Sequence, residues 1–183
     1  MSTTSSDEYV VRPLERDDFA KGYCSLLGQL TQADFTQEVC LSLPCCCTVT
    51  QFNIVVLKFL FSYGLFQQFE TRFDQLEQLK AIQPTFIFVA EHISTHTVVA
   101  SAACAVELKF IHSNGMVGHI EDVVTDGEHR RKGLAKSILQ ELQAAASAFG
   151  CYKVILDCAE HNVPVYEKAG FKQKEIQMVK YFE

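Results

Sequence analysis

The chain has 183 residues and a formal net charge of −6, with 48% hydrophobic and 21% charged residues. A chain of this length is typical of one domain that buries a core and carries a cleft. Its lysines and arginines are dispersed apart from one short cluster, which excludes the extended basic face of a nucleic-acid-binding protein.

Residues 1–7 are small, polar and acidic. They lack the basic start and apolar core of a secretory signal and the arginine-rich pattern of a transit peptide. Four of the eight cysteines crowd residues 40–47, and the others lie in apolar runs. We therefore expect a cytosolic protein with reduced, mostly buried thiols.

Residues 9–14 form a β-rich run that predicts a strand, and Asp17 follows as a candidate helix N-cap. The predicted helix carries apolar side chains on one face, namely Phe19, Tyr23, Leu26 and Leu27.

Residues 39–67 are far more apolar and cysteine-rich than their surroundings. Their apolar part, residues 52–66, contains Lys58 and is shorter than the roughly 20 residues that a membrane-spanning helix needs. A buried or loosely attached helix is therefore expected in place of a membrane anchor.

Removing residues 39–67 joins Glu38 to Gln68 and restores a capping box, with Thr36 as N-cap and Gln68 three places on. A helix with Phe69, Phe73 and Leu76 at helical spacing follows. A valine codon begins with the two bases that open most introns, and a glutamine codon can end with the two that close them. Our hypothesis is that a retained intron encodes this segment and interrupts one domain spanning residues 1–183; sequencing the spliced transcript tests it.

Residues 85–91 and 98–110 are β-rich apolar runs separated by a turn-like segment, which predicts a hairpin. Residues 116–125 continue the sheet, with antiparallel strands up to this point. Residues 133–149 have helical periodicity ending at Gly150, and residues 152–157 are apolar in their centre, as in a parallel strand covered on both faces. A short helix over 161–169, stopped by Gly170, and a last strand over 171–182 complete an α/β (α+β) fold.

The strongest local signal is the run Arg130-Arg131-Lys132-Gly133-Leu134-Ala135 between a strand and the long helix. Unpaired N–H groups at a helix start, a glycine and flanking cations suit a pyrophosphate. A solvated basic helix start is the alternative. The pattern Arg-x-x-Gly-x-Ala is similar to the coenzyme A loop of the GNAT acetyltransferase superfamily.

Four further strings, LGQLT, ELKFIH, IEDVVT and GCYKVILDCAEHNVPVYEKAGF, occur in this order. They resemble those of glucosamine-6-phosphate N-acetyltransferases, and the resemblance extends along most of the chain outside residues 39–67. The resemblance implies a GNAT fold, with a mixed twisted sheet flanked by helices and splayed between its fourth and fifth strands. It also implies a homodimer with the sugar site near its interface.

The reaction that the resemblance implies is acetyl transfer from acetyl-CoA to the 2-amino group of D-glucosamine 6-phosphate, a step toward UDP-N-acetylglucosamine. The pantetheine would pair with the backbone of residues 123–125 in the splay, and the pyrophosphate would meet residues 131–136. The implied cofactor-binding residues are Val123, Val124, Thr125, Arg130, Arg131, Lys132, Gly133, Leu134, Ala135, Lys136, Asp157, Asn162, Tyr166, Glu167 and Lys168. Asn162 would also brace the start of its short helix.

The implied catalytic residues are Glu121 as general base, with Asp157 as its rival, and Tyr166 as the acid for the departing thiolate. Transfer from Tyr166 would be helped by a site that favours the phenolate. Because neighbours on a strand point to opposite faces, at most one of Glu121 and Asp122 is expected to face a given site. Without the resemblance, a solvated strand end and a core-packing tyrosine explain the same residues.

For the sugar phosphate, the resemblance implies cations in the KFIH string. The implied substrate-binding residues are Thr31, Lys109, Phe110, Ile111, His112, Glu121, Asp122, Val123, Tyr152, Lys153 and Lys180. Lys180 stands near the place where the family usually has an arginine, and a point charge does not reproduce a bidentate fork.

Two rival functions remain. A GNAT enzyme could take a peptide or polyamine acceptor, against which Lys109 and His112 argue. If residues 39–67 are translated, the chain could instead be a catalytically impaired coenzyme A binding module. No metal is expected, because the sequence has no Cys-x-x-Cys or paired-histidine spacing.

Overall fold

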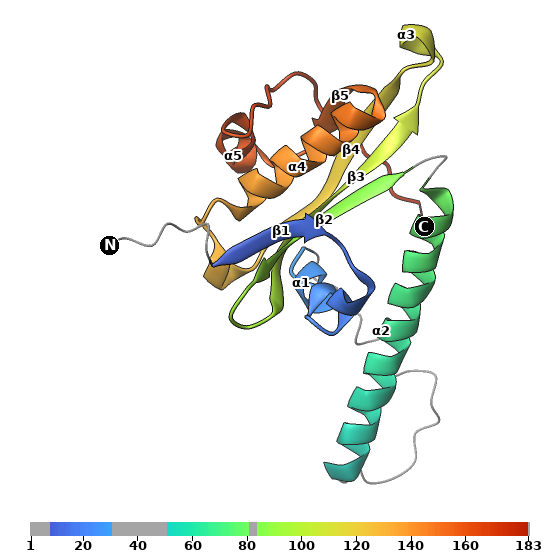
Figure 1. The fold of residues 1–183 in the computed structure, drawn as a ribbon, viewed down its shortest axis with the longest axis vertical. Coiled ribbons are helices and arrows are strands. Elements are labelled where there is room, and N and C mark those ends of the chain that lie inside the picture. The colour runs from blue at the N-terminus through green and yellow to red at the C-terminus, as the bar shows by residue number, and fades with distance from the viewer. Residues whose placement is uncertain (1–7, 31–50, 81–83, 183) are drawn as a thin grey trace.

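A five-stranded sheet forms the centre of the protein in a computed structural model that describes residues 8–30, 51–80 and 84–182, without the side chains of residues 51–62 (Figure 1). The strands follow one another in chain order across the sheet. They are β1 (Tyr9–Pro13), β2 (Thr85–His92), β3 (Thr97–Leu108), β4 (Met116–Thr125) and β5 (Cys151–Leu156).

The sheet is mixed, as predicted. The first four strands pair antiparallel, and β5 pairs parallel to β4. The β4–β5 pairing runs from Met116 opposite Cys151 to Ile120 opposite Leu156, whereas β4 continues to Thr125. This confirms the predicted splay between the fourth and fifth strands.

Helices cover both faces of the sheet (Figure 1). On one face, α4 (Leu134–Phe149) packs on a core that includes Ala90, and on the other, α1 (Tyr23–Leu27) and α2 (Gln51–Leu79) pack on a core that includes its neighbour Val89. The helical elements are η1 (Arg16–Phe19), α1 (Tyr23–Leu27), α2 (Gln51–Leu79), α3 (Ile111–Asn114), η2 (Gly127–His129), α4 (Leu134–Phe149), η3 (Glu160–Asn162) and α5 (Val163–Glu167).

The first predicted helix is wrong in detail. It is divided into η1 and α1 by Gly22, whose φ of 87° lies in the left-handed region. Glu15, and not Asp17, is the residue that precedes η1 and shares a capping box with Asp18.

Helix α2 is continuous through residues 51–79, so the apolar residues from 51 to 67 and the predicted helix after them form one element. Phe69 is buried against α1, and Arg16 pairs with Glu70 and Asp74. Thr36 and residues 39–50 lie outside the described residues, and the retained-intron hypothesis stays a prediction. None of the helices described combines the length and apolarity needed to cross a membrane.

Strand β5 lies at the edge of the sheet, and its Tyr152, Lys153 and Ile155 are exposed, so the prediction of a strand covered on both faces is wrong. The predicted last strand is also wrong, because residues 171–182 have no strand pairing. Apolar residues favour a strand only where a neighbouring strand offers hydrogen-bond partners. This C-terminal segment instead exposes Ile176, Met178, Val179, Tyr181 and Phe182.

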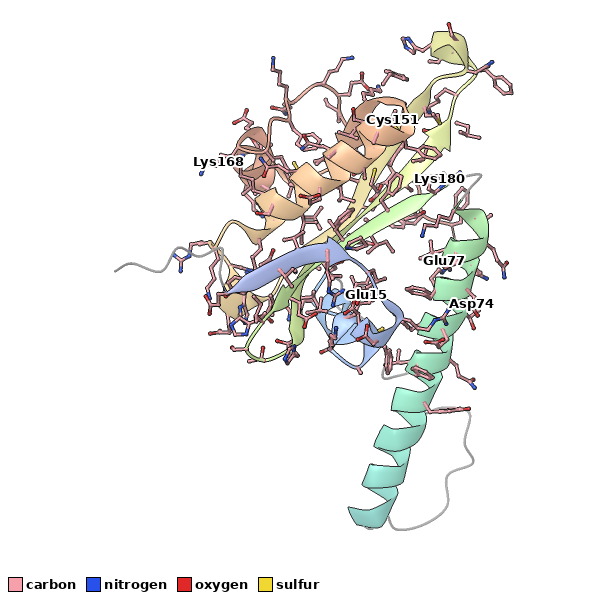
Figure 2. The ribbon with its side chains drawn as sticks, in the orientation of Figure 1. Glu15, Asp74, Glu77, Cys151, Lys168 and Lys180 are labelled. Atoms are coloured by element: carbon pink, nitrogen blue, oxygen red, sulfur yellow. The ribbon has the colours of Figure 1, made fainter. Side chains whose placement is uncertain are left out.

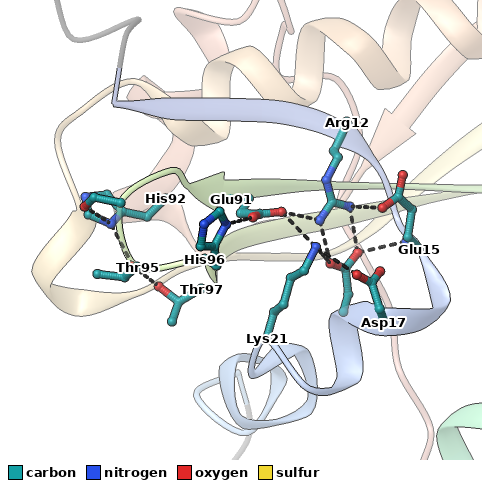
Figure 3. A network of polar contacts seen from close by, with 11 residues as sticks. Arg12, Glu15, Asp17, Lys21, Glu91, His92, Thr95, His96 and Thr97 are labelled. Atoms are coloured by element: carbon teal, nitrogen blue, oxygen red, sulfur yellow. Dashed lines mark hydrogen bonds and ion pairs between the residues drawn. The ribbon is translucent and has the colours of Figure 1, made fainter.

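A buried ion-pair network joins β1, η1 and the β2–β3 hairpin (Figure 3). Arg12 donates to both carboxylate oxygens of the fully buried Asp18 over 2.8 and 2.6 Å, and to Glu91 over 2.5 Å. Lys21 and His96 also reach Glu91, at 3.1 and 3.0 Å. The hydrogen bond from Arg12 is the main cause that lowers the pKa of Glu91 to about 2.

Candidate active site

The predicted pyrophosphate loop lies between η2 and α4. Arg131 and Gly133 have positive φ values of 63° and 82°, and the intervening Lys132 does not. Such alternation makes backbone N–H groups converge into a concavity that binds anions. Gly133 precedes α4 without a side-chain cap, so the first N–H groups of this 16-residue helix stay open to a ligand.

The loop fits a pyrophosphate. A Cβ at Gly133 would meet nothing within 4 Å, so the left-handed backbone, and not crowding, favours glycine there. Among the residues described, no carboxylate pairs with Arg130, Arg131 or Lys136, although Arg130 Nε donates to the Thr125 carbonyl over 3.3 Å. The side chain of Lys132 is engaged elsewhere, because its Nζ donates to the Tyr9 hydroxyl over 2.5 Å.

The splay opens at the two rival bases. Glu121 directly follows the last paired residue of β4, and Asp157 directly follows the last paired residue of β5. Beyond this point, the β5-facing backbone groups of residues 121–125 have no partner strand in the described part of the chain. These groups can pair with an extended amide-containing ligand, as predicted for pantetheine.

A bulge interrupts β4 at the same place. The β3–β4 register shifts between Ser101 and Ala103, and Asp122 has a φ of 55°. A positive φ in a residue other than glycine is strained and is typical of functional sites. The alternation that predicted opposite faces for Glu121 and Asp122 is broken here, and both residues are exposed.

Asp157 and Tyr166 line one cavity of about 840 Å³, bounded by β5, α5 and the C-terminal segment. Asp157 Oδ2 accepts a hydrogen bond of 2.8 Å from Gln177 Nε2, and Glu121 does not line this cavity. Tyr166 is half-buried and meets Phe171 edge to face at 6.2 Å. Burial raises the pKa of Tyr166, so this site keeps the phenol protonated and does not favour the phenolate.

The other predicted coenzyme residues lie in α5 or directly beside its ends. Asn162 stands at its N-cap position but makes no side-chain capping bond, so the prediction that it braces the helix start is wrong. Asn162 has a helical backbone conformation. Its backbone N–H donates to the Ala159 carbonyl over 2.8 Å, which closes the turn that leads into α5. Glu167 and Lys168 are exposed at the end of α5, where Figure 2 labels Lys168.

The predicted phosphate-binding residues lie at the β3–β4 connection. His112 has a φ of 54°, and its ring packs on Tyr152 of β5 with centroids 4.5 Å apart. Lys153 Nζ lies 5.8 Å from the same tyrosine ring. Phe110 and Ile111 are exposed beside them. The structure thus brings His112, Tyr152 and Lys153 together.

Lys109 points elsewhere, because its Nζ pairs with Glu107 at 2.5 Å. Glu107 also accepts a hydrogen bond of 2.7 Å from Nε2 of His119 on β4. Sequence reasoning missed Glu107 and His119, although Glu107 and Lys109 stand two residues apart as same-face neighbours. Lys180 lies in the C-terminal segment with its Nζ over the Phe182 ring, and Thr31 lies outside the described residues.

Outside this site, the four described cysteines, Cys24, Cys104, Cys151 and Cys158, are free thiols. No group of three or more potential metal ligands gathers in the described ranges.

The chain is similar to known proteins in both sequence and fold. Residues 56–171 match the model of the acetyltransferase (GNAT) family. The chain is 37% identical over 181 residues to glucosamine 6-phosphate N-acetyltransferase 1 of Dictyostelium discoideum, covering 99% of this chain and 96% of that protein. The crystal structure of glucosamine-6-phosphate N-acetyltransferase from Arabidopsis thaliana superposes with a TM-score of 0.73 at 34% identity, covering 96% of this chain and 99% of the other. The chain therefore belongs to the acetyltransferase (GNAT) family.

Proposed function

We propose that the chain transfers the acetyl group of acetyl-CoA to the 2-amino group of D-glucosamine 6-phosphate. The products are N-acetyl-D-glucosamine 6-phosphate and coenzyme A. The observation that carries this proposal is the identity, over nearly the whole chain, to relatives named for this reaction. A sugar phosphate acceptor is preferred to a peptide or polyamine because His112, Lys153 and Lys109 supply positive or protonatable groups.

Acetyl-CoA supplies the acetyl group as a thioester, and the loop and the splay account for its binding. The N–H groups of residues 131–136 bind the diphosphate, assisted by Arg130, Arg131 and Lys136. The unpaired backbone of Val123–Thr125 positions the pantetheine arm and polarises the thioester oxygen. Asn162, Glu167 and Lys168 flank the coenzyme from α5.

The proton steps belong to the residues at the mouth of the splay. Glu121 takes the proton that the attacking amine loses, directly or through water, and Tyr166 gives its phenolic proton to the departing thiolate. We favour Glu121 over Asp157 as the base, because Asp157 already accepts a hydrogen bond from Gln177. Burial raises the pKa of Tyr166, so the phenol is protonated and available as the acid at neutral pH, although it is a weaker acid toward the thiolate than an ordinary tyrosine.

The acceptor sits on the exposed side of β4 and β5. His112, Tyr152 and Lys153 bind its phosphate, and Lys109 joins them when it leaves Glu107. Asp122 and the Val123 backbone bind the sugar hydroxyls. Phe110 and Ile111 form the rim.

We further propose that the enzyme is a homodimer. The outer edge of β5 and the C-terminal segment both present unpaired backbone groups, and the segment exposes five large apolar side chains. An exposed strand edge pairs readily with an extended segment of another chain. A dimer that covers these surfaces would also place Lys180 of one copy near the sugar site of the other.

The test is steady-state thiol release from acetyl-CoA with a panel of acceptors, corrected by an acceptor-free control for the thiols of the protein. The full chain and a chain lacking residues 39–67 are compared. We expect kcat/KM for glucosamine 6-phosphate to exceed that for unphosphorylated glucosamine, a lysine peptide and spermidine by tenfold or more. The reason is that the phosphate forms a desolvated charge pair with the cationic side chains of the site. Equal rates with glucosamine and its phosphate would contradict the proposal.

A further inference from the structure

Three aromatic rings pack together directly beside the diphosphate loop. They belong to Tyr9 of β1, His92 of β2 and His129 of η2. The ring centroid of His92 lies 5.2 Å from that of Tyr9 and 5.3 Å from that of His129, and the centroids of Tyr9 and His129 lie 5.7 Å apart. Tyr9 and His92 are only 8% and 9% exposed. His92 is fixed in turn by Glu8 at 3.0 Å and Thr95 at 2.7 Å. The cluster therefore joins the N-terminal strand to the residue that immediately precedes the loop.

The Tyr9 hydroxyl contacts the side chains at both ends of the first turn of that loop, Lys132 and His129. Lys132 Nζ donates to it over 2.5 Å, and its oxygen lies 3.0 Å from His129 Nδ1. An ammonium group has donors only, so the Tyr9 oxygen accepts from Lys132 and its own proton is free to be donated to His129. One atom of β1 thus ties residue 129 to residue 132.

We propose that Tyr9 is a positioning residue whose hydroxyl holds residues 129–133 in the shape that receives the diphosphate. Lys132 then acts through Tyr9 and not as a direct phosphate ligand. This inference rests on the proposed function for the ligand of the loop.

The physical reason is pre-organisation. Arg131 is held at a φ of 63°, and a strained residue persists only where its surroundings hold it. The Tyr9 contact fixes the residues on both sides of Arg131. A loop that is ordered before its ligand arrives saves the cost of ordering on binding.

The test compares Tyr9→Phe with the wild-type chain. Phenylalanine keeps the ring packing and removes both polar contacts of the hydroxyl. We expect the Kd for coenzyme A, measured by calorimetry, to rise about three- to tenfold, as the loss of one or two hydrogen bonds implies. The KM for acetyl-CoA should rise in parallel, with kcat at saturation and the KM of the sugar unchanged.

A second readout needs no ligand. The loop contains Arg130, Arg131 and Lys132, so trypsin cleaves there when it opens, and mass spectrometry locates the cuts. Cleavage in Tyr9→Phe should be several-fold faster. The matched control is Tyr63→Phe on α2, where the lost hydroxyl is exposed and, among the described residues, accepts a hydrogen bond only from Gln67 at 3.0 Å. This control should match the wild type in both readouts.

A double-mutant cycle decides how Lys132 acts. If Lys132 works through Tyr9, the variant Tyr9→Phe/Lys132→Met should bind coenzyme A about as weakly as Lys132→Met alone. A direct phosphate contact would make the two losses multiply, which would overturn the proposed role of Lys132.

The outcomes separate this inference from the proposed function. A folded wild-type chain that takes up no coenzyme A contradicts the proposed function, while faster loop cleavage in Tyr9→Phe still supports the role of Tyr9 in the loop. Equal cleavage and equal affinity in Tyr9→Phe and wild type overturn that role and leave the proposed function intact.

Discussion

At the scale of single residues, Glu121 and Asp157 hold matched places. Glu121 follows the last paired residue of β4, and Asp157 follows the last paired residue of β5. Of the two, only Asp157 accepts a side-chain hydrogen bond from a described residue, Gln177. A hydrogen bond that a carboxylate accepts stabilises its charged form, which makes that carboxylate a weaker base. We infer that the two carboxylates have different roles although they lie at the same opening.

We predict that Glu121→Gln lowers kcat about 10²-fold or more, the usual contribution of a general base, whereas Asp157→Asn lowers it by less than tenfold. Both substitutions preserve shape and remove charge, so each is the control for the other. Rate measurements at saturating substrates decide between them, and the reverse order of effects would assign the base to Asp157.

Tyr166→Phe is expected to lower kcat by one to two orders of magnitude with little change in either KM, because only proton donation is lost. Since burial raises the pKa of Tyr166 above its ordinary value of 10, the alkaline fall in kcat due to its ionisation should have its midpoint above pH 10. A pH–rate profile checks this. An alkaline limb near neutral pH that vanishes in the phenylalanine variant would contradict it.

The sequence could predict which residues lie near the splay but not how the backbone aims them. The IEDVVT string identified Glu121 and Asp122, whereas the bulge at Asp122 has no sequence signature, because its strain is sustained by the surrounding sheet. The ion pair that draws Lys109 to Glu107 also depends on side-chain geometry that spacing does not determine.

At the scale of elements, the Arg12 network binds β1 to η1 and the β2–β3 hairpin (Figure 3). Arg12→Met would leave the buried Asp18 and Glu91 without their main partner. Breaking a buried pair by removing one member costs about 3 to 5 kcal/mol. Urea denaturation should show this loss, and Arg72→Met on the exposed surface of α2 serves as the matched control. A loss below about 1 kcal/mol would mean that the network contributes little.

The same network predicts an acid dependence of stability. The pKa of Glu91 is lowered from 4.5 to about 2, mainly by Arg12. A lowered folded-state pKa gives stability that is fully present above about pH 4.5 and is lost as the pH falls toward 2. Thermal melts between pH 5 and pH 2 should therefore fall less steeply for Glu91→Gln than for the wild type. Parallel curves would contradict the prediction.

Elements with a strong hydrophobic periodicity could be predicted from the sequence. Elements that need a neighbouring strand as a hydrogen-bond partner could not. The apolar spacing of α4 and its terminal glycine gave a correct helix. Residues 171–182 read as a strand because of their composition, yet a strand needs a neighbour, and the chain itself supplies none for the described segment.

At the scale of the whole molecule, the exposed apolar C-terminal segment predicts a dimer. Analytical ultracentrifugation should show two copies for the full chain. Replacing Ile176, Met178 and Val179 together by serine should yield monomers that remain folded by circular dichroism. A dimer of unchanged affinity in this variant would place the interface elsewhere.

The most direct measurement follows a ¹³C-labelled acetyl carbonyl from acetyl-CoA in the presence of the protein and glucosamine 6-phosphate. The proposed function predicts that the thioester resonance disappears and that one amide resonance appears on the nitrogen at sugar carbon 2. A folded, coenzyme A binding protein that leaves the label on the thioester, or moves it to another acceptor, would contradict the proposed function.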